Sequence, residues 1–339
     1  MRQGIISVLY KKGARNDPRN YRPITLLNND YKILMRILTK RMNEAVVQFV
    51  SKDQCGFVPD AFIAENTMRL KLLQDYIEEG DQDALFIFLD MEKAFDRCSW
   101  EFLIEGLRAV GFGTGFIKYV ELAYSTNAPP TRQLHVNGFL GPSFPLGSGV
   151  AQGCPLSPLL FLIIAEPLAR MINNDPRIRG ISVESMGPDG RPRVTTHKIS
   201  QFADDSTLML RTFCVKHAQK VLNTWCDATS MKENATKREV LLLGRTRRYD
   251  EAQLPEEIDR ATIVKDGDTI RALGVPMGNE IDIEAWWKSR YNVVKARFAK
   301  WHGLGTLTLT GRNILVQSIL YGSMRYWFFS LPTPSSMVK

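Results

Sequence analysis

The sequence contains few cysteine and histidine residues, and those present are not spaced for a cross-link or a zinc site. Five cysteines and four histidines occur among 339 residues, and no two cysteines form a CxxC pair. An odd number of scattered cysteines argues against a disulfide framework and against a structural zinc. A reducing compartment is therefore expected. The cysteines are Cys55, Cys98, Cys154, Cys214 and Cys226.

The sequence also lacks a long hydrophobic run. Its most apolar stretch, residues 158–169, is interrupted by Glu166 and Pro167 and is too short to cross a bilayer. We expect a buried helix there. The N-terminus lacks the apolar segment of a signal peptide. These absences predict no membrane association and an intracellular location, either nuclear or cytoplasmic.

The composition is that of a globular protein, but its charge is unevenly distributed. Hydrophobic residues make up 44% and charged residues 24%, which argues against extensive disorder. The net charge is +8. Residues 1–41 hold ten Lys and Arg against two acids, and residues 281–339 hold eight against two. Basic ends on either side of an acidic centre favour a site that binds phosphates at its flanks and a metal ion at its centre. For each basic end taken alone, a solvated surface is the alternative explanation.

Hydrophobic patterns of strand and helix follow one another in mixed order, which is typical of an α+β fold. Residues 84–89 form an apolar run that fits a strand buried on both faces. Asn137-Gly138 predicts a hairpin, and Ser99 is a predicted N-cap. We expect strands at 5–10, 84–89, 133–136, 139–144, 240–243 and near 270–275, and helices at 31–49, 65–79, after 99, and at 158–173, 215–230 and from 283 onward.

Three carboxylates stand at predicted strand ends. Asp90 follows the strand at 84–89, and Asp204 and Asp205 occupy the turn of a strand–turn–strand pattern at 198–210. Mg²⁺ prefers hard oxygen ligands and binds through a few carboxylates together with substrate phosphates. If the two strands are neighbours, the three side chains converge on one metal site. The alternative is ordinary turn chemistry, because Asp is common in turns.

These carboxylates belong to a series of ordered motifs: FLDMEKAFDRCSW (88–100), GVAQGCPLSPLLF (149–161) and ISQFADDSTLML (199–210). The three resemble the palm motifs of reverse transcriptases, most closely those of the non-LTR, LINE-type retrotransposon branch. The finger motifs of that branch are similar to NYRPITLLNNDYKIL (20–34) and QCGFVP (54–59). Its later motifs and thumb are similar to SMKENATKREVLLLG (230–244), ALGVPMG (272–278) and GRNILVQSILYGSMRYW (311–327).

The resemblance implies an α+β right-hand polymerase with an antiparallel palm sheet. Fingers are expected at 1–80, palm with finger insertions at 81–280, and a partial thumb at 281–339. The implied activity is RNA-directed DNA synthesis, in which two Mg²⁺ ions, or Mn²⁺ as a substitute, assist transfer of dNMP from dNTPs to a DNA primer on an RNA template. Two alternatives remain open: a catalytically weak or inactive retroelement remnant that only binds nucleic acid, and a domesticated interaction module.

For the metal site, the resemblance assigns Asp90 and Asp204 as the main ligands. Asp205 is the second acid of the turn, with a weaker or shared role, and its alternative role is to hold the turn. The backbone carbonyl of Met91 is expected to face a metal. Asp96 is expected to hold the turn that follows it, outside the metal site.

For the substrates, the resemblance implies that Phe95 is a steric gate against a 2′-OH, although Phe is more often a core residue. Gln152 and Gly153 would lie over the nascent base pair, and the alternative is a simple loop before a helix. Lys237 would protonate the leaving pyrophosphate. Arg22 would contact template or triphosphate, and a solvated arginine is the alternative.

Two positions depart from the family pattern. Asp60 and Ala61 follow GFVP where the family usually has Gly-Arg, and Ala151 stands where the family often has Arg. The missing Arg at position 61 would face the triphosphate, so weak dNTP affinity is expected. An upstream endonuclease and a C-terminal Cys/His cluster are not found, so we expect a fragment or a decayed copy of a larger retroelement protein.

Overall fold

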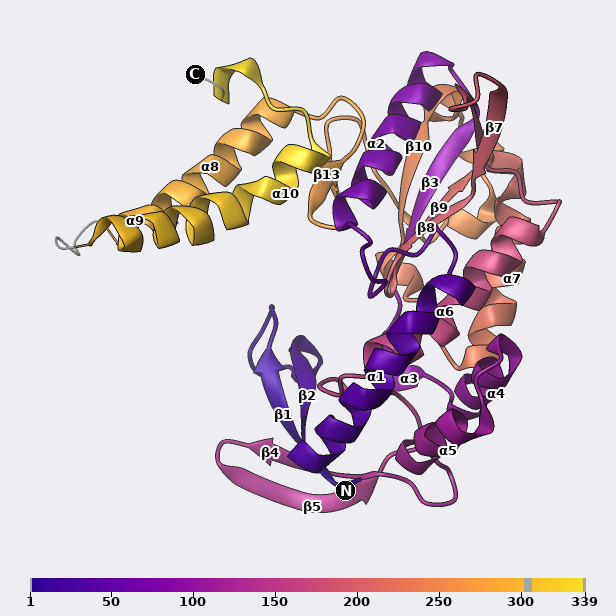
Figure 1. The fold of residues 1–339 in the computed structure, drawn as a ribbon. Helices are drawn as coiled ribbons and strands as arrows, with labels where there is room; N and C mark the ends of the chain where they lie inside the picture. The colour runs from indigo at the N-terminus through magenta and orange to yellow at the C-terminus, as the bar shows by residue number, and fades with distance from the viewer. Residues whose placement is uncertain (1, 302–306, 338–339) are drawn as a thin grey trace.

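The computed structural model describes residues 2–301 and 307–337. An N-terminal sheet lies at one end of the molecule and has the strand order β2-β1-β4-β5 (Figure 1). Because β1 pairs with both β2 and the distant β4, this sheet joins two separate parts of the sequence. The predicted Asn137-Gly138 hairpin is confirmed as the turn between β4 and β5. The strands are β1 (Gly4–Tyr10), β2 (Tyr21–Leu27), β4 (Thr131–Val136) and β5 (Phe139–Pro145).

A central sheet has the order β11-β10-β3-β9-β8 and is antiparallel except where β10 meets β11. Leu85 and Ile87 of β3 pack into the core that contains helix α6, whereas Phe86 packs on the other face with Leu70 of helix α2. Burial on both faces explains the uninterrupted apolar run at 84–89. The strands are β3 (Ala84–Leu89), β8 (Ile199–Phe202), β9 (Asp205–Leu210), β10 (Glu239–Leu243) and β11 (Thr262–Ile263).

Helices cover both faces of the central sheet. The predicted N-cap Ser99 is confirmed, because its side chain accepts the N–H of Phe102. The buried helix α6 is also confirmed, and its Glu166 accepts the backbone N–H of Ser51 at 3.0 Å. The helices are α1 (Asn29–Phe49), α2 (Ile63–Glu79), α3 (Ala94–Arg97), α4 (Trp100–Val110), α5 (Thr114–Ala123), α6 (Ser157–Asn174) and α7 (Val215–Thr229). Helix α5 and the hairpin of β6 (Ile181–Met186) and β7 (Pro192–His197) were not among the expected elements.

The C-terminal region is a helical projection attached through a small hairpin (Figure 1). This region has a small hydrophobic core of its own, in which the buried Trp287 packs with Val294 and Met324. Residues 302–306 and 338–339 of the expected thumb lie outside the described residues. Within the described ranges, no helix is long and apolar enough to cross a membrane. The elements are β12 (Ile270–Ala272), β13 (Val275–Met277), α8 (Ile283–Ala299), α9 (Leu309–Leu315), a π-helical segment (Val316–Tyr321) and α10 (Gly322–Ser330).

Candidate active site

The strand register brings the predicted carboxylates to one end of the central sheet. Strands β3 and β9 are antiparallel neighbours, and their last paired residues are Leu89 and Ser206. Continuing this register by one residue places Asp90 beside Asp205. Asp204 precedes Asp205 in the tight turn between β8 and β9. The condition set by the sequence, that the two strands be neighbours, is therefore met.

Burial and neighbouring negative charge raise the pKa values of the two carboxylates of the turn, Asp204 and Asp205. Desolvation, followed by the charge of Asp90, raises the pKa of Asp204. Desolvation, followed by the charges of Asp204 and Asp90, raises the pKa of Asp205 to about 6. Lys11 and Arg22 act in the opposite direction on Asp204. Negative charge in this part of the protein is thus only partly balanced by the cations of the N-terminal sheet.

The donor set suits a hard divalent cation, because it consists of carboxylate oxygens at the ends of rigid strands. Within residues 2–301 and 307–337, however, no three His, Cys, Asp or Glu side chains stand close enough together to hold a metal ion as they are placed. The residue types, rather than their present grouping, are what fit Mg²⁺.

The backbone of Met91 is oriented by a bridge on the side away from β9. Met91 stands opposite Glu233, while the N–H of Asn234 donates to the Asp90 carbonyl at 2.8 Å. In such an antiparallel pair, the N–H and C=O of Met91 itself point away from Glu233. The carbonyl of Met91 therefore lies on the side of the chain that faces away from Glu233 and toward β9.

Lys237 reaches the same end of the sheet from a short helical turn, Ala235–Lys237. Its Nζ lies 3.3 Å from Oδ2 of Asp90, and the two side chains are 64% and 44% exposed. An ion pair this exposed contributes little to stability. It does place one ammonium group directly beside a candidate metal ligand.

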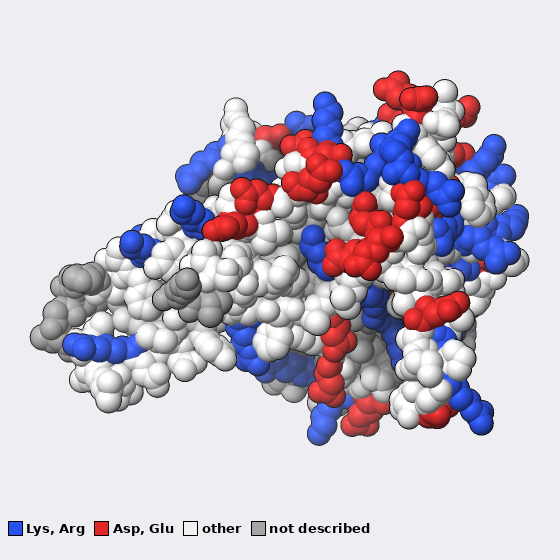
Figure 2. Space-filling model, turned by 90° about the horizontal axis from the view of Figure 1, so that it is seen from above, with Lys and Arg blue, Asp and Glu red and all other residues white. Residues whose placement is uncertain are grey.

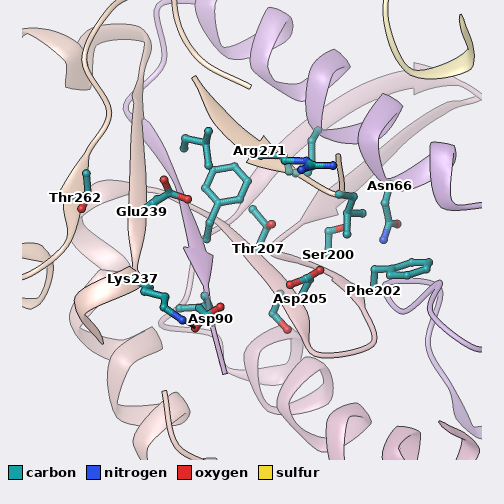
Figure 3. A pocket seen from close by; sticks show the side chains of 17 residues that line it. Asn66, Asp90, Ser200, Phe202, Asp205, Thr207, Lys237, Glu239, Thr262 and Arg271 are labelled. Carbon is teal, nitrogen blue, oxygen red and sulfur yellow. Dashed lines mark hydrogen bonds and ion pairs between the residues drawn. The ribbon is translucent and has the colours of Figure 1, made fainter. Parts of the chain in front are cut away.

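A cavity of about 330 Å³ adjoins the carboxylates, between the central sheet, α2 and the β12–β13 hairpin. Figure 3 shows Asp90, Lys237 and Glu239 on one side and Asp205 with Thr207 on the neighbouring strand. Sequence reasoning missed Glu239, whose pKa is raised by desolvation and by Asp90. The sequence did contain a signal for Glu239, because this residue begins the strand that follows Lys237 and so lies near a residue already assigned to the site.

Arg271 on β12 is a second lining residue that the sequence did not single out. Its side chain enters the cavity wall from the hairpin opposite the sheet (Figure 3). No local pattern marks it, because its proximity depends on how the β12–β13 hairpin packs against α2 and the sheet.

The half-buried Phe95 stands between two other aromatic rings. It stacks on Phe161 of α6 with a centroid distance of 4.9 Å and an interplanar angle of 10°. The edge of Phe57 meets it at 6.1 Å and 89°. Phe95 thus packs against the core, which is the alternative role considered for it. Its ring partners on two sides fix its orientation.

The loop carrying Gln152 and Gly153 is fastened to the N-terminal sheet. The Gln152 carbonyl accepts the N–H of Thr25 at 2.7 Å, and its side-chain amide donates to Asp96 at 3.3 Å. Gly153 has a φ of 120°, and a Cβ there would lie 2.4 Å from the Thr25 carbonyl oxygen. Only glycine permits this approach. Arg22, exposed on β2 of the same sheet, lies near enough to influence Asp204.

Of the two departures from the expected motifs, one lies in this loop and the other lies just before α2. Ala151 is buried, and its N–H donates to the hydroxyl of Tyr124 at 3.3 Å. Ala61 follows Asp60, which has a φ of 62°, just before α2 begins. Neither alanine can supply the cation that the family pattern has at its position.

The aromatic residues of the C-terminal helices mainly pack the helices together. The indole of Trp287 is buried, donates to the Pro332 carbonyl at 3.0 Å and stacks on Phe328. Trp286 packs edge-on against both Trp287 and Trp327, and Arg290 lies over its ring. Tyr291, Trp301 and Tyr321 are exposed, so aromatic as well as basic side chains of this region face solvent.

The sequence profile described as "Reverse transcriptase (RNA-dependent DNA polymerase)" matches residues 9–277. The chain belongs to the reverse transcriptase family. Its curated relatives include the 149 kDa protein of transposon TX1 of Xenopus laevis, which is 28% identical over 342 residues, covering 100% of this chain and 25% of that protein. The RNA-directed DNA polymerase from mobile element jockey of Drosophila melanogaster is 25% identical over 226 residues, covering 66% of this chain and 23% of that protein.

A solved structure supports the fold of this chain. The apo telomerase of Candida tropicalis superposes with a TM-score of 0.51 at 12% identity, covering 81% of this chain and 47% of the telomerase chain. The expected α+β right-hand fold with an antiparallel sheet is therefore confirmed, as is the resemblance to non-LTR retrotransposon proteins. The chain spans only about a quarter of the length of the two curated relatives.

Proposed function

We propose that this chain is an RNA-directed DNA polymerase, which joins dNMP to the 3′-OH of a DNA primer on an RNA template and releases pyrophosphate. The observation that carries the proposal is the convergence of Asp90 with Asp204 and Asp205 at adjacent strand ends. The family match supports it, and one relative is described as an RNA-directed DNA polymerase.

Asp90, Asp204, Asp205 and the Met91 carbonyl would hold the metal. The chemistry that bound Mg²⁺ would supply here is positive charge to offset the negative charge that develops during phosphoryl transfer. Burial and, after it, repulsion from neighbouring carboxylates raise the pKa values of Asp204 and Asp205, and a divalent cation would relieve that repulsion. Lys237, held at 3.3 Å from Asp90, would donate a proton to the departing pyrophosphate.

Phe95 and the Gln152–Gly153 loop would select the incoming nucleotide. Because Phe161 supports the Phe95 ring from behind, the ring cannot easily retreat from a 2′-OH, and dNTPs would be preferred. The loop bonds to Thr25, so Gln152 and Gly153 would lie over the new base pair from the finger side. Arg22 of β2 would meet the template or the triphosphate.

The two basic ends of the chain would hold the template and primer. We assign residues 1–80 to fingers, 81–280 to palm with β4 and β5 as a finger insertion, and 281–339 to thumb. The described part of the thumb has seven Lys and Arg against two acids. Figure 2 shows a few basic side chains on the projecting helices, and basic and acidic side chains mixed over the rest of this face. Phosphate contacts of this kind weaken as salt rises.

A primer-extension assay tests the proposal. Purified protein is incubated with a DNA primer annealed to RNA, dNTPs and Mg²⁺, and binding of the same duplex is measured in parallel. Asp204→Asn should abolish extension and leave binding nearly unchanged. The matched control is Asp227→Asn, which removes an exposed carboxylate on α7. Binding without extension by the native protein would favour the nucleic-acid-binding remnant, and failure of both would favour the interaction module.

A further inference from the structure

A buried glutamine of the finger motif contacts the catalytic turn through its side-chain amide. Gln54 is 2% exposed and lies outside every described helix and strand. Its Oε1 accepts the N–H of Ala203 at 2.8 Å, and its Nε2 donates to the carbonyl of Ala203 at 3.3 Å. One side chain therefore satisfies both backbone polar groups of the residue that immediately precedes Asp204.

Ala203 adopts a backbone conformation that alanine does not favour. Its φ is 56°, and it is the first of the two residues that connect β8 with β9. A positive φ at this position and a negative φ at the next describe a type II′ turn, in which glycine is the usual first residue. Alanine pays a steric penalty there that other contacts must offset. The paired hydrogen bonds from Gln54 are such contacts.

The neighbours of Gln54 fix it in place. Gln54 forms a parallel bridge with Gln201 of β8, and the N–H of Cys55 donates to the Gln201 carbonyl at 3.0 Å. Gly56 donates its N–H to Oε1 of Gln54 at 2.7 Å. A Cβ on Gly56 would lie 2.2 Å from the nitrogen of Ala203, so glycine is required for this close packing.

We propose that Gln54 is a positioning residue for the catalytic carboxylates, an inference that rests on the proposed function of the Asp204–Asp205 turn. By holding Ala203 at its positive φ, Gln54 sets the direction in which Asp204 leaves the turn. The same segment continues into Phe57, whose ring meets the gate residue Phe95 at 6.1 Å. Gln54 thus links the finger segment to the metal site without touching metal or substrate.

Four variants test this role: Gln54→Ala, Gln54→Glu, Gln54→Ala with Ala203→Gly, and Gln74→Ala as the control. Gln74 is also a buried glutamine bonded to backbone, but it donates to the Gly278 carbonyl at 2.8 Å, away from the turn. Glutamate at position 54 keeps the length and the acceptor and loses the donor to Ala203. It supplies the test if Gln54→Ala does not fold.

The first readout is hydrogen exchange of the Ala203 amide, and the second is Mn²⁺ affinity measured by electron paramagnetic resonance. Gln54→Ala should speed exchange and weaken Mn²⁺ binding by about tenfold, the lower end for loss of a residue that orients a ligand. Gln54→Glu should weaken Mn²⁺ binding less. Ala203→Gly should recover Mn²⁺ affinity in the Gln54→Ala background, because glycine adopts positive φ without support. Gln74→Ala should change neither readout.

The proposal is overturned if Gln54→Ala, or Gln54→Glu in its place, leaves both readouts unchanged, or if Gln74→Ala changes them equally. It is also overturned if Ala203→Gly gives no recovery. Failure of the proposed function gives a different result: the native protein would extend no primer, while exchange at Ala203 would still report whether Gln54 holds the turn.

Discussion

Asp205 should make the metal-free protein less stable at neutral pH, and replacing it with asparagine should make the protein more stable while impairing catalysis. Its pKa is raised from 3.8 to about 6 by desolvation and by Asp204 and Asp90. A carboxyl with a raised pKa binds its proton more tightly in the folded protein. The fold is therefore destabilised above pH 6, and the destabilisation disappears as the pH falls from 6 toward 3.8.

The size of this effect follows from the pKa difference. A shift of about two units corresponds to at most ~3 kcal/mol. Because the Asp205 side chain is still exposed to solvent, screening reduces this to about 1 kcal/mol. For a protein of this size, whose unfolding entropy is about 0.7 kcal/mol/K, that amounts to about 1–2 °C in Tm. Asp205→Asn should thus raise Tm by this amount at pH 7 in EDTA.

Thermal unfolding at pH 7 and pH 5, each with EDTA or Mg²⁺, measures the prediction. The increase in Tm caused by Asp205→Asn should be smaller at pH 5, where the Asp205 carboxyl of the native protein is already mostly protonated. Mg²⁺ should stabilise the native protein more than the variant. Asp175→Asn is the control, and it should lower Tm rather than raise it. Hydrogen bonds from Arg177 lower the pKa of Asp175 to about 2, so the carboxylate of Asp175 stabilises the fold at pH 7. A lower Tm for Asp205→Asn at pH 7, or a gain independent of pH, would refute the electrostatic argument.

Three further changes test the substrate side of the site. Lys237→Gln should lower the turnover of primer extension by about 100-fold or more, as expected for loss of a general acid; unchanged turnover would exclude that role. Phe95→Ala should increase incorporation of rNTPs relative to dNTPs by at least about tenfold, as measured by single-nucleotide insertion, and an unaltered ratio would show that the ring serves only the core. Gly153→Ala should lower Tm and raise the KM for dNTPs, because its Cβ would meet the Thr25 carbonyl oxygen at 2.4 Å; a native KM would mean that the loop does not contact the nucleotide.

The parts of the fold that the sequence predicted depend on local patterns. Residues 84–89 were recognised as a strand because burial on both faces requires apolar side chains throughout. The N-cap at Ser99 and the hairpin at Asn137-Gly138 follow from short-range hydrogen bonding and turn geometry. The β6–β7 hairpin escaped recognition because most of its residues are exposed and follow no hydrophobic alternation.

The parts that the sequence could not predict depend on contacts between distant segments. The motif order placed Asp90 and Asp204 in one site, but only the pairing of β3 with β9 shows that their strands are neighbours. Arg271 and Gln54 were missed because each joins the site through packing of a separate element. Arg271 reaches the site through the packing of β12, and Gln54 reaches it through the packing of the segment before α2. No local sequence pattern encodes either contact.

The most direct test of the central claim is dNTP incorporation on an RNA-templated primer by the native protein and by Asp90→Asn. The account predicts Mg²⁺-dependent extension that falls to background in the variant, with duplex binding retained. Extension that persists at the native rate in Asp90→Asn would contradict the assignment of the metal site to the ends of β3 and β9.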